Sequence, residues 1–170
     1  VAHRVLPLDH ANFGLIPRHT VQAAEAFQKR AEQFARETAD HVHAIVPFPP
    51  DSNLVCLALN PRGNRDLARA NAFLQRIHAR LNSDPAQPIQ IKQFFASTTS
   101  ISPAVLGLAD MHRILDALGI DPATMAEEGG ADRLFILRHT LMNPYLIDHE
   151  NRISFIDRYF QYLKTCVEHA

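Results

Sequence analysis

Apolar positions along this chain recur with two different periods. Runs of mainly aliphatic residues bounded by Gly, Pro, Asn, Asp or Ser indicate β-strands, and apolar residues repeated every three or four positions indicate amphipathic helices. The strand-like runs are residues 43–48, 53–60, 89–101 and 133–142. The helix-like segments are residues 20–42, 63–81, 103–118 and 148–167. This pattern predicts an α+β fold in which helices cover a three- to four-stranded, mostly antiparallel sheet, preceded by one long helix.

Residues that prefer helix ends define the expected boundaries. Thr20 and Asp148 are predicted to cap the first and last helices, because their side-chain oxygens can accept hydrogen bonds from free amides at a helix N-terminus. Ser102 and Pro103 predict the start of the third helix, and Gly119 predicts its end.

The strand-like run at residues 53–60 is apolar except at its two ends. NLVCLALN has no strongly polar side chain between Asn53 and Asn60. Strands of this kind are typically buried on both faces. We therefore expect this strand to be central in the sheet.

Strand alternation places Arg138 among apolar residues. Side chains at every second position share a face, so Arg138 should lie with Thr140, while His139 points to the opposite face. A charge in such surroundings is costly unless something pairs with it. One interpretation is a structural ion pair with a carboxylate. The other is an anion receptor, because guanidinium presents a planar fork to a carboxylate or phosphate. The spacing alone is compatible with both.

Composition and charge argue against several classes of function. The 170 residues suit one domain, or a domain with an appendage, and a formal net charge of -1 gives no basic field for nucleic acid or an acidic membrane. No apolar run approaches the ~20 residues of a membrane span. Cys56 and Cys166 suggest neither a disulfide framework nor a metal site, as expected in a reducing cytoplasm.

Histidine positions give only weak signals of chemistry. Asp40, His41 and His43 cluster near a predicted helix-to-strand junction, but no further ligand of suitable spacing accompanies them, so no metal site is predicted. His139 and His149 are interpreted as structural histidines rather than proton shuttles.

The serines near residue 100 are interpreted as structural. Ser97, Ser100 and Ser102 lie in FASTTSIS, which lacks the glycines of a nucleophile elbow. They are typical of strand ends and helix caps. No catalytic residue is therefore predicted in this chain.

Four segments, taken in order, resemble the C-terminal part of the pyridoxal-phosphate-dependent amino acid decarboxylases, which include glutamate, aromatic amino acid and diaminobutyrate decarboxylases. They are PPDSNLVCLALN, FFASTTSI, FILRHTLMNPYL and ISFIDRYFQYL. The resemblance implies the small C-terminal domain of a fold-type-I enzyme. Residues 43–170 would form this domain, and residues 1–42 would be the tail of the large domain and the connecting helix. Helices would cover one face of the sheet, and the large domain would cover the other.

The resemblance also implies a cofactor, a substrate and partners. In this family, pyridoxal phosphate takes up the electrons released as the substrate carboxylate leaves as CO2. Arg138 matches the position at which glutamate-specific members hold a substrate carboxylate, so it is expected to bind substrate. The expected partners are the enzyme's own large domain, the second subunit of a homodimer and an amino acid substrate, all in the cytoplasm.

The lysines of this chain do not match the family's Schiff-base motif. Lysine occurs only at positions 29, 92 and 164, and none follows a His or Ser, as the family's lysine does. We therefore expect a fragment that is inactive alone, with no cofactor-binding residue and no bound cofactor. The strand-like opening at Val1 also suggests a piece of a longer protein.

Two other hypotheses remain open at this stage. A stand-alone α+β ligand-binding or regulatory module would explain the absent lysine motif and would make Arg138 half of a structural ion pair. A small metal hydrolase that uses His41 and His43 ranks last.

Overall fold

The computed structural model describes residues 14–82, 88, 93–126, 131–148 and 150–170. Its main sheet consists of β1 (Val42–Ile45), β2 (Leu54–Pro61), β3 (Ser97–Ile101) and β4 (Leu134–Thr140). The spatial order is β1-β2-β4-β3, and each neighbouring pair is antiparallel. The predicted α+β fold with an antiparallel sheet is therefore confirmed, and the apolar β2 is central, as expected.

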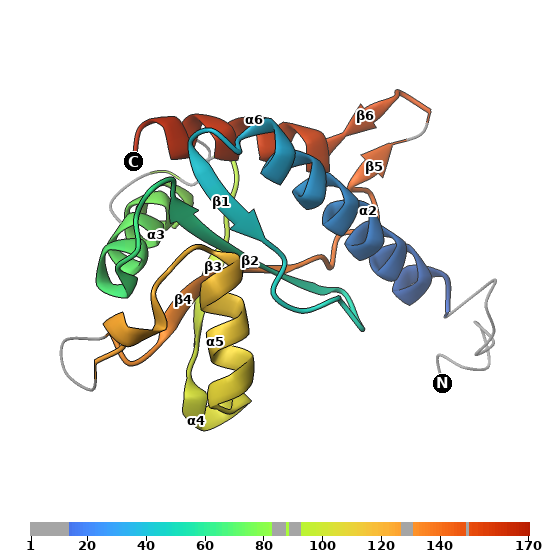
Figure 1. The fold of residues 1–170 in the computed structure, drawn as a ribbon. Helices are drawn as coiled ribbons and strands as arrows, with labels where there is room; N and C mark the ends of the chain where they lie inside the picture. Colours follow the sequence, from blue (N-terminus) through green and yellow to red (C-terminus); the bar gives the residue numbers. More distant parts are fainter. Residues whose placement is uncertain (1–13, 83–87, 89–92, 127–130, 149) are drawn as a thin grey trace.

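Helices and one small hairpin complete the described fold (Figure 1). The helices are α2 (Leu15–Glu37), α3 (Leu67–Leu81), α4 (Pro103–Leu106), α5 (Leu108–Ala117) and α6 (Phe155–Glu168), with a 3-10 turn, η2, at Pro122–Thr124. The hairpin pairs β5 (Ile147–Asp148) with β6 (Ile153–Ser154). Within the described ranges, no helix combines the length and hydropathy needed to cross a membrane.

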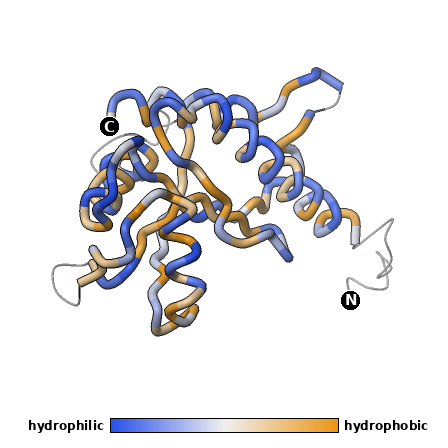
Figure 2. The backbone as a smooth tube through the Cα atoms, in the orientation of Figure 1, coloured by the Kyte–Doolittle hydropathy of each residue, from blue (hydrophilic) through white to orange (hydrophobic). Residues whose placement is uncertain are grey.

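One face of the sheet is buried beneath α2, α3 and α6. Phe34 of α2 and Phe160 of α6 are fully buried, with ring centroids 5.4 Å apart. They belong to the same hydrophobic cluster as Leu57 of β2 and Leu137 of β4. Figure 2 shows hydrophobic residues along the central strands and hydrophilic residues on the outer sides of the helices. The long helix thus packs against the sheet and contributes to the same hydrophobic cluster.

The opposite face of the sheet is covered in part by α5. Met111 and Ile114 of α5 are buried in a second cluster with Ile136 of β4. The expectation that the chain's own helices cover only one face is therefore wrong, because the apolar stripe of α5 also needs a surface to bury. Farther along the same face, Arg138 and Thr140 are exposed. Among the described residues, this face is therefore uncovered near the end of β4.

The long helix begins and ends earlier than predicted. It starts at Leu15, so Thr20 is not its N-cap but lies within the helix and donates a hydrogen bond to the carbonyl oxygen of Pro17 at 2.9 Å. Proline is compatible with the first turn, because the amides there have no intrahelical acceptor. The helix ends at Glu37 rather than near Val42, where β1 already begins.

The last helix is capped by a different residue from the one predicted. Asp148 lies in the β5–β6 hairpin, and its carboxylate accepts a hydrogen bond from the amide of Asn151 at 3.0 Å. Ser154 is the N-cap of α6 instead, and its hydroxyl oxygen accepts from the amide of Asp157 at 3.1 Å. The hairpin therefore precedes the helix, and its last residue, Ser154, provides the cap.

Two further segments differ in extent from the predictions. The third predicted helix is divided into α4 and α5 at Gly107, whose φ of 83° lies in the left-handed region that favours glycine. Gly119, with φ of 74°, follows α5 as expected. The strand predicted over residues 89–101 is observed only as β3, and residues 89–92 lie outside the described residues.

Replacing Phe160 by alanine should destabilise the chain by about 3–5 kcal/mol, because it removes a fully buried ring between α2 and the sheet. Urea unfolding monitored by circular dichroism measures this change. The control is Val105→Ala at a position that is 76% exposed, which should change stability by less than about 0.5 kcal/mol. An equally small effect of Phe160→Ala would contradict the packing described here.

Candidate functional site

A pocket of about 460 Å³ opens where β4 extends beyond β3. Ser97 is the first residue of β3 and pairs with Arg138, so the last residues of β4 have no β3 partner. The pocket is lined by α2, α6, the end of β4, and the segments just before β3 and just after β4. The candidate site is thus a consequence of the unequal lengths of two neighbouring strands.

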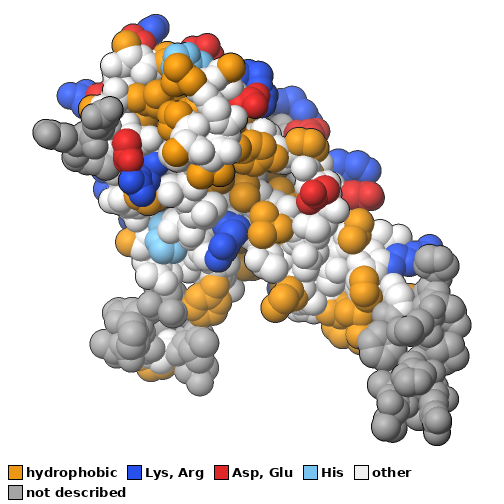
Figure 3. Space-filling model, turned by 90° about the horizontal axis from the view of Figure 1, so that it is seen from below, with side chains coloured by type: hydrophobic (Ala, Val, Ile, Leu, Met, Phe, Trp, Pro, Cys, Tyr) orange, Lys and Arg blue, Asp and Glu red, His pale blue; other side chains and the backbone are white. Residues whose placement is uncertain are grey.

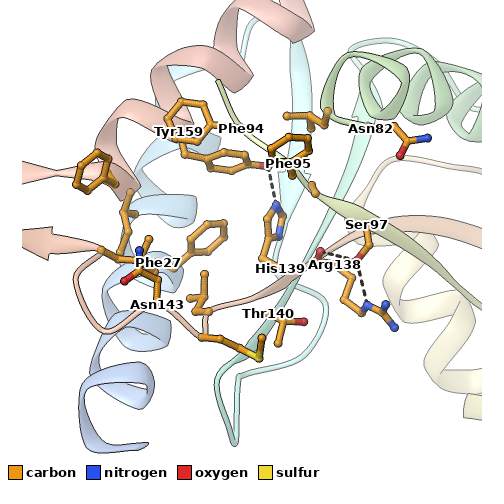
Figure 4. Close-up of a pocket in the computed structure, with 17 residues that line it drawn as sticks. Phe27, Asn82, Phe94, Phe95, Ser97, Arg138, His139, Thr140, Asn143 and Tyr159 are labelled. Carbon is orange, nitrogen blue, oxygen red and sulfur yellow. Dashed lines mark hydrogen bonds between the residues drawn. The ribbon is translucent and has the colours of Figure 1, made fainter. Parts of the chain in front are cut away.

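The inner wall of this pocket is aromatic, and its rim carries both polar and exposed apolar side chains (Figure 4). The wall is lined by Phe27 of α2, by Tyr159 of α6 and by Phe94, which precedes β3. The rings of Phe94 and Tyr159 meet edge to face, with centroids 5.6 Å apart. Ser97 and Arg138 lie at the rim. An apolar cavity with a few placed polar groups is typical of small-molecule sites.

Arg138 is exposed at the rim and is hydrogen-bonded to the neighbouring strand. Its Nε donates to the hydroxyl oxygen of Ser97 at 3.2 Å. In the described part of the chain, no carboxylate lies within ion-pair distance of its guanidinium group. The structural interpretation required such a carboxylate. The geometry therefore favours a guanidinium group that is free to receive an anion.

Cys56 lies opposite Arg138 on β2. Burial raises the pKa of this thiol, and the positive charge of Arg138 only partly opposes the shift. The thiol is therefore protonated near neutral pH, and it is a poor nucleophile in that form. Cys56 contributes packing beneath the arginine rather than chemistry.

His139 and Tyr159 both line the pocket and form a buried hydrogen-bonded pair. Nδ1 of His139 lies 3.2 Å from the carbonyl oxygen of Val55. A carbonyl can only accept, so Nδ1 carries the proton, and Nε2 accepts a hydrogen bond from the hydroxyl of Tyr159. Figure 4 shows His139 directed toward Tyr159, whereas Arg138 points away from the rings.

Burial keeps both members of this pair uncharged near neutral pH. It lowers the pKa of His139 to about 4, although the hydrogen bond to Val55 acts in the opposite direction. Burial also raises the pKa of Tyr159. Neither group exchanges a proton readily at neutral pH, so the geometry supports the interpretation of His139 as structural.

The other residues considered from the sequence do not join this site. His43 accepts a hydrogen bond from Arg62 at 3.2 Å, and burial, followed by the charge of Arg62, lowers its pKa. Among the residues that the structure describes, no three His, Cys, Asp or Glu side chains are grouped as metal ligands. Ser100 and Ser102 do not line the pocket, and His149 lies outside the described residues.

The lysines that the structure describes lie away from this pocket. Lys29 and Lys164 are exposed on helix surfaces, and neither lines the pocket beside Arg138. Lys92 lies outside the described ranges.

Two features of the site were not predicted from the sequence. The contact between Ser97 and Arg138 joins residues 41 positions apart, and only the β3–β4 register reveals it. Phe27 and Tyr159 were expected on helices, but nothing in helical periodicity indicates that they line a pocket. Cross-strand pairing of FASTTSI with FILRHT is the signal that could have found Ser97.

Stability should fall as the pH is lowered from about 6.5 to about 4, because the neutral form of His139 is required in the folded state. A folded-state pKa below the unfolded value means that unfolding takes up a proton in this range. The loss attributable to His139 is at most about 3 kcal/mol. Urea unfolding of the wild-type chain and of His139→Gln at several pH values measures it. Parallel pH profiles for the two proteins would show that His139 is not the group responsible.

Comparison with known proteins identifies the family of this domain. Residues 23–169 match the profile of the family described as tyrosine decarboxylase, C-terminal. The chain is also similar to an L-tyrosine decarboxylase of Enterococcus faecium, with 25% identity over 148 residues, which are 86% of this chain and 23% of the relative. The chain thus spans about a quarter of the length of the relative that it matches. These findings confirm the resemblance to the decarboxylases. Because the match extends from within α2 to the end of α6, the chain belongs to the tyrosine decarboxylase C-terminal domain family.

Proposed function

We propose that this chain is the C-terminal domain of a pyridoxal-phosphate-dependent amino acid decarboxylase, in which Arg138 binds a carboxylate of the substrate. The observation that carries the proposal is the exposed guanidinium group at the mouth of an aromatic pocket, without a carboxylate partner in the described residues. A stand-alone regulatory module has less support, because both comparisons identify decarboxylases.

The role of this domain would be to bind and orient the substrate. The terminal nitrogens of Arg138 can donate two parallel hydrogen bonds to a carboxylate, which fixes its direction as well as its position. The guanidinium group is exposed and points away from the aromatic wall, so the large domain would have to cover it to exclude water and strengthen this interaction. Pyridoxal phosphate, held by the rest of the enzyme, would supply the electron sink for decarboxylation.

An aromatic amino acid is the first candidate substrate. The family and its relative are both described by tyrosine decarboxylation, and the aromatic wall suits a phenol ring. In that case Arg138 would hold the only carboxylate of the substrate, which departs as CO2.

An acidic amino acid is a second candidate, and Arg138 itself favours it. A cation on the departing carboxylate stabilises the bound substrate more than the transition state, because the negative charge moves away as CO2 leaves. A cation on a side-chain carboxylate stabilises both states equally. The interaction with Arg138 therefore opposes the chemical step less if the substrate carries a second carboxylate.

The exposed part of this sheet face, near the end of β4, is the proposed contact with the large domain. Leu54, which pairs with Thr140, is exposed, as are Met142 and Tyr145 just after β4. Figure 3 shows hydrophobic side chains gathered on the underside of the molecule, and patches of this kind mark interaction sites. Residues 1–42 would then belong to the large domain and the connecting helix, and residues 43–170 to the small domain. A homodimer in the cytoplasm would complete the enzyme.

The isolated chain should form no defined covalent adduct with pyridoxal phosphate. Lys29 and Lys164 are exposed, so borohydride reduction should trap only partial, heterogeneous imines with surface amines. Intact-mass analysis after reduction, followed by peptide mapping, measures this. A stoichiometric adduct on one lysine would contradict the proposed division of roles between the domains.

In the complete enzyme, Arg138→Met should lower kcat/KM about tenfold to hundredfold, the worth of a charge-assisted hydrogen bond of about 1.5–3 kcal/mol. Kinetics with tyrosine and with glutamate separate the two candidate substrates. If Arg138 holds the departing carboxylate, the loss should appear in KM while kcat is maintained or rises.

Arg133→Met is the matched control for this experiment, because Arg133 lies just before the opposite end of β4 and is bonded to Asp132. It should retain the kinetics of the unmodified enzyme. If Arg138→Met also retains them with both amino acids, Arg138 does not bind the substrate.

A further inference from the structure

The hydroxyl of Ser97 forms hydrogen bonds with both the side chain and the main chain of Arg138. Its oxygen accepts a hydrogen bond from Nε of the arginine at 3.2 Å, and the same hydroxyl donates to the arginine's own main-chain carbonyl oxygen at 3.1 Å. Figure 4 shows both bonds, which connect the side chain of Arg138 back to its own backbone through one residue of the neighbouring strand. The direction of the long side chain is thereby restricted.

This arrangement occupies one defined edge of the guanidinium group. Arginine has five N–H donors, one on Nε and two on each terminal nitrogen. Ser97 bonds to Nε, so the two terminal nitrogens can still donate two parallel hydrogen bonds to a carboxylate. Neither of them has a hydrogen-bond partner among the described residues. The contact with Ser97 therefore orients the arginine without using the fork.

The sheet register makes Ser97 the suitable residue for this role. Ser97 and Cys56 lie directly opposite Arg138 on its two neighbouring strands. Cys56 is buried, and a thiol is only a weak acceptor. Ser97 is half-buried at the start of β3, so its hydroxyl is beside the arginine and next to the pocket.

We propose that Ser97 is a positioning residue, which holds Arg138 in the orientation that receives the substrate carboxylate. This inference rests on the proposed function. A long, flexible side chain loses conformational freedom when it binds, and ordering it beforehand reduces that loss. Ser97 would thus contribute to affinity without touching the substrate.

The test compares two isosteric variants of the complete enzyme. Ser97→Thr keeps the hydroxyl, and Ser97→Val replaces that hydroxyl by a methyl group of similar shape; both are β-branched residues that suit a strand. Ser97→Val should raise KM about threefold to tenfold, the worth of one hydrogen bond, with kcat little changed. Ser97→Thr should stay close to the unmodified enzyme. Ser100→Val, on the same strand but the opposite face, is the control and should leave KM unchanged.

A double-mutant cycle with Arg138→Met distinguishes positioning from a general structural role. If Ser97 acts through Arg138, Ser97→Val should have no further effect on KM once the arginine is absent. An equal rise of KM in both backgrounds would overturn the inference, as would a normal KM for Ser97→Val alone. If Arg138→Met itself is normal, the proposed function fails, and this inference fails with it.

Discussion

The register of β4 between β2 and β3 is the constraint on which the candidate site depends. Leu137 and His139 point into the cluster beneath α2 and α6, while Ile136 and Arg138 point to the opposite face. A shift of one residue in the register of β4 would move each of these side chains to the other face of the sheet. It would bury the guanidinium of Arg138 beside Phe27 and expose His139. The burial of apolar residues on both faces therefore also determines that Arg138 is at the surface.

The aromatic wall depends on how α2 and α6 pack over this strand. Phe27 lies against His139 and Phe160, with ring centroids 4.6 and 4.8 Å apart. Arg30 of α2 also bonds to Asp157 of α6 at 3.1 Å. Because that pair is near the surface, ring packing contributes more to the helix contact than the ion pair does. His139 and Tyr159, which are joined by a buried hydrogen bond, both line the pocket.

The apolar runs were sufficient to predict the main sheet, because β2 is apolar on both faces, as a central strand requires, and β4 places buried and exposed side chains on opposite faces at its end. They predicted that β2 is central and that Arg138 and His139 face opposite sides. They did not predict the N-caps of α2 and α6, because several polar residues near each helix start could serve, and tertiary packing selects among them. They also could not reveal the contacts of Ser97 with Arg138 and of Tyr159 with His139, which depend on register and on helix docking. The role of Arg138 came from resemblance, and the family comparison supports the domain on which that resemblance rests.

The central claim is that Arg138 binds a carboxylate of the substrate once the domain is part of the complete enzyme. The most direct test is a crystal structure of the holoenzyme with a substrate analogue that keeps its carboxylate and cannot lose CO2. Both terminal nitrogens of Arg138 are expected to lie about 2.7–2.9 Å from the carboxylate oxygens of the analogue. A structure in which the large domain supplies an Asp or Glu to Arg138, and the analogue's carboxylate binds elsewhere, would contradict this claim.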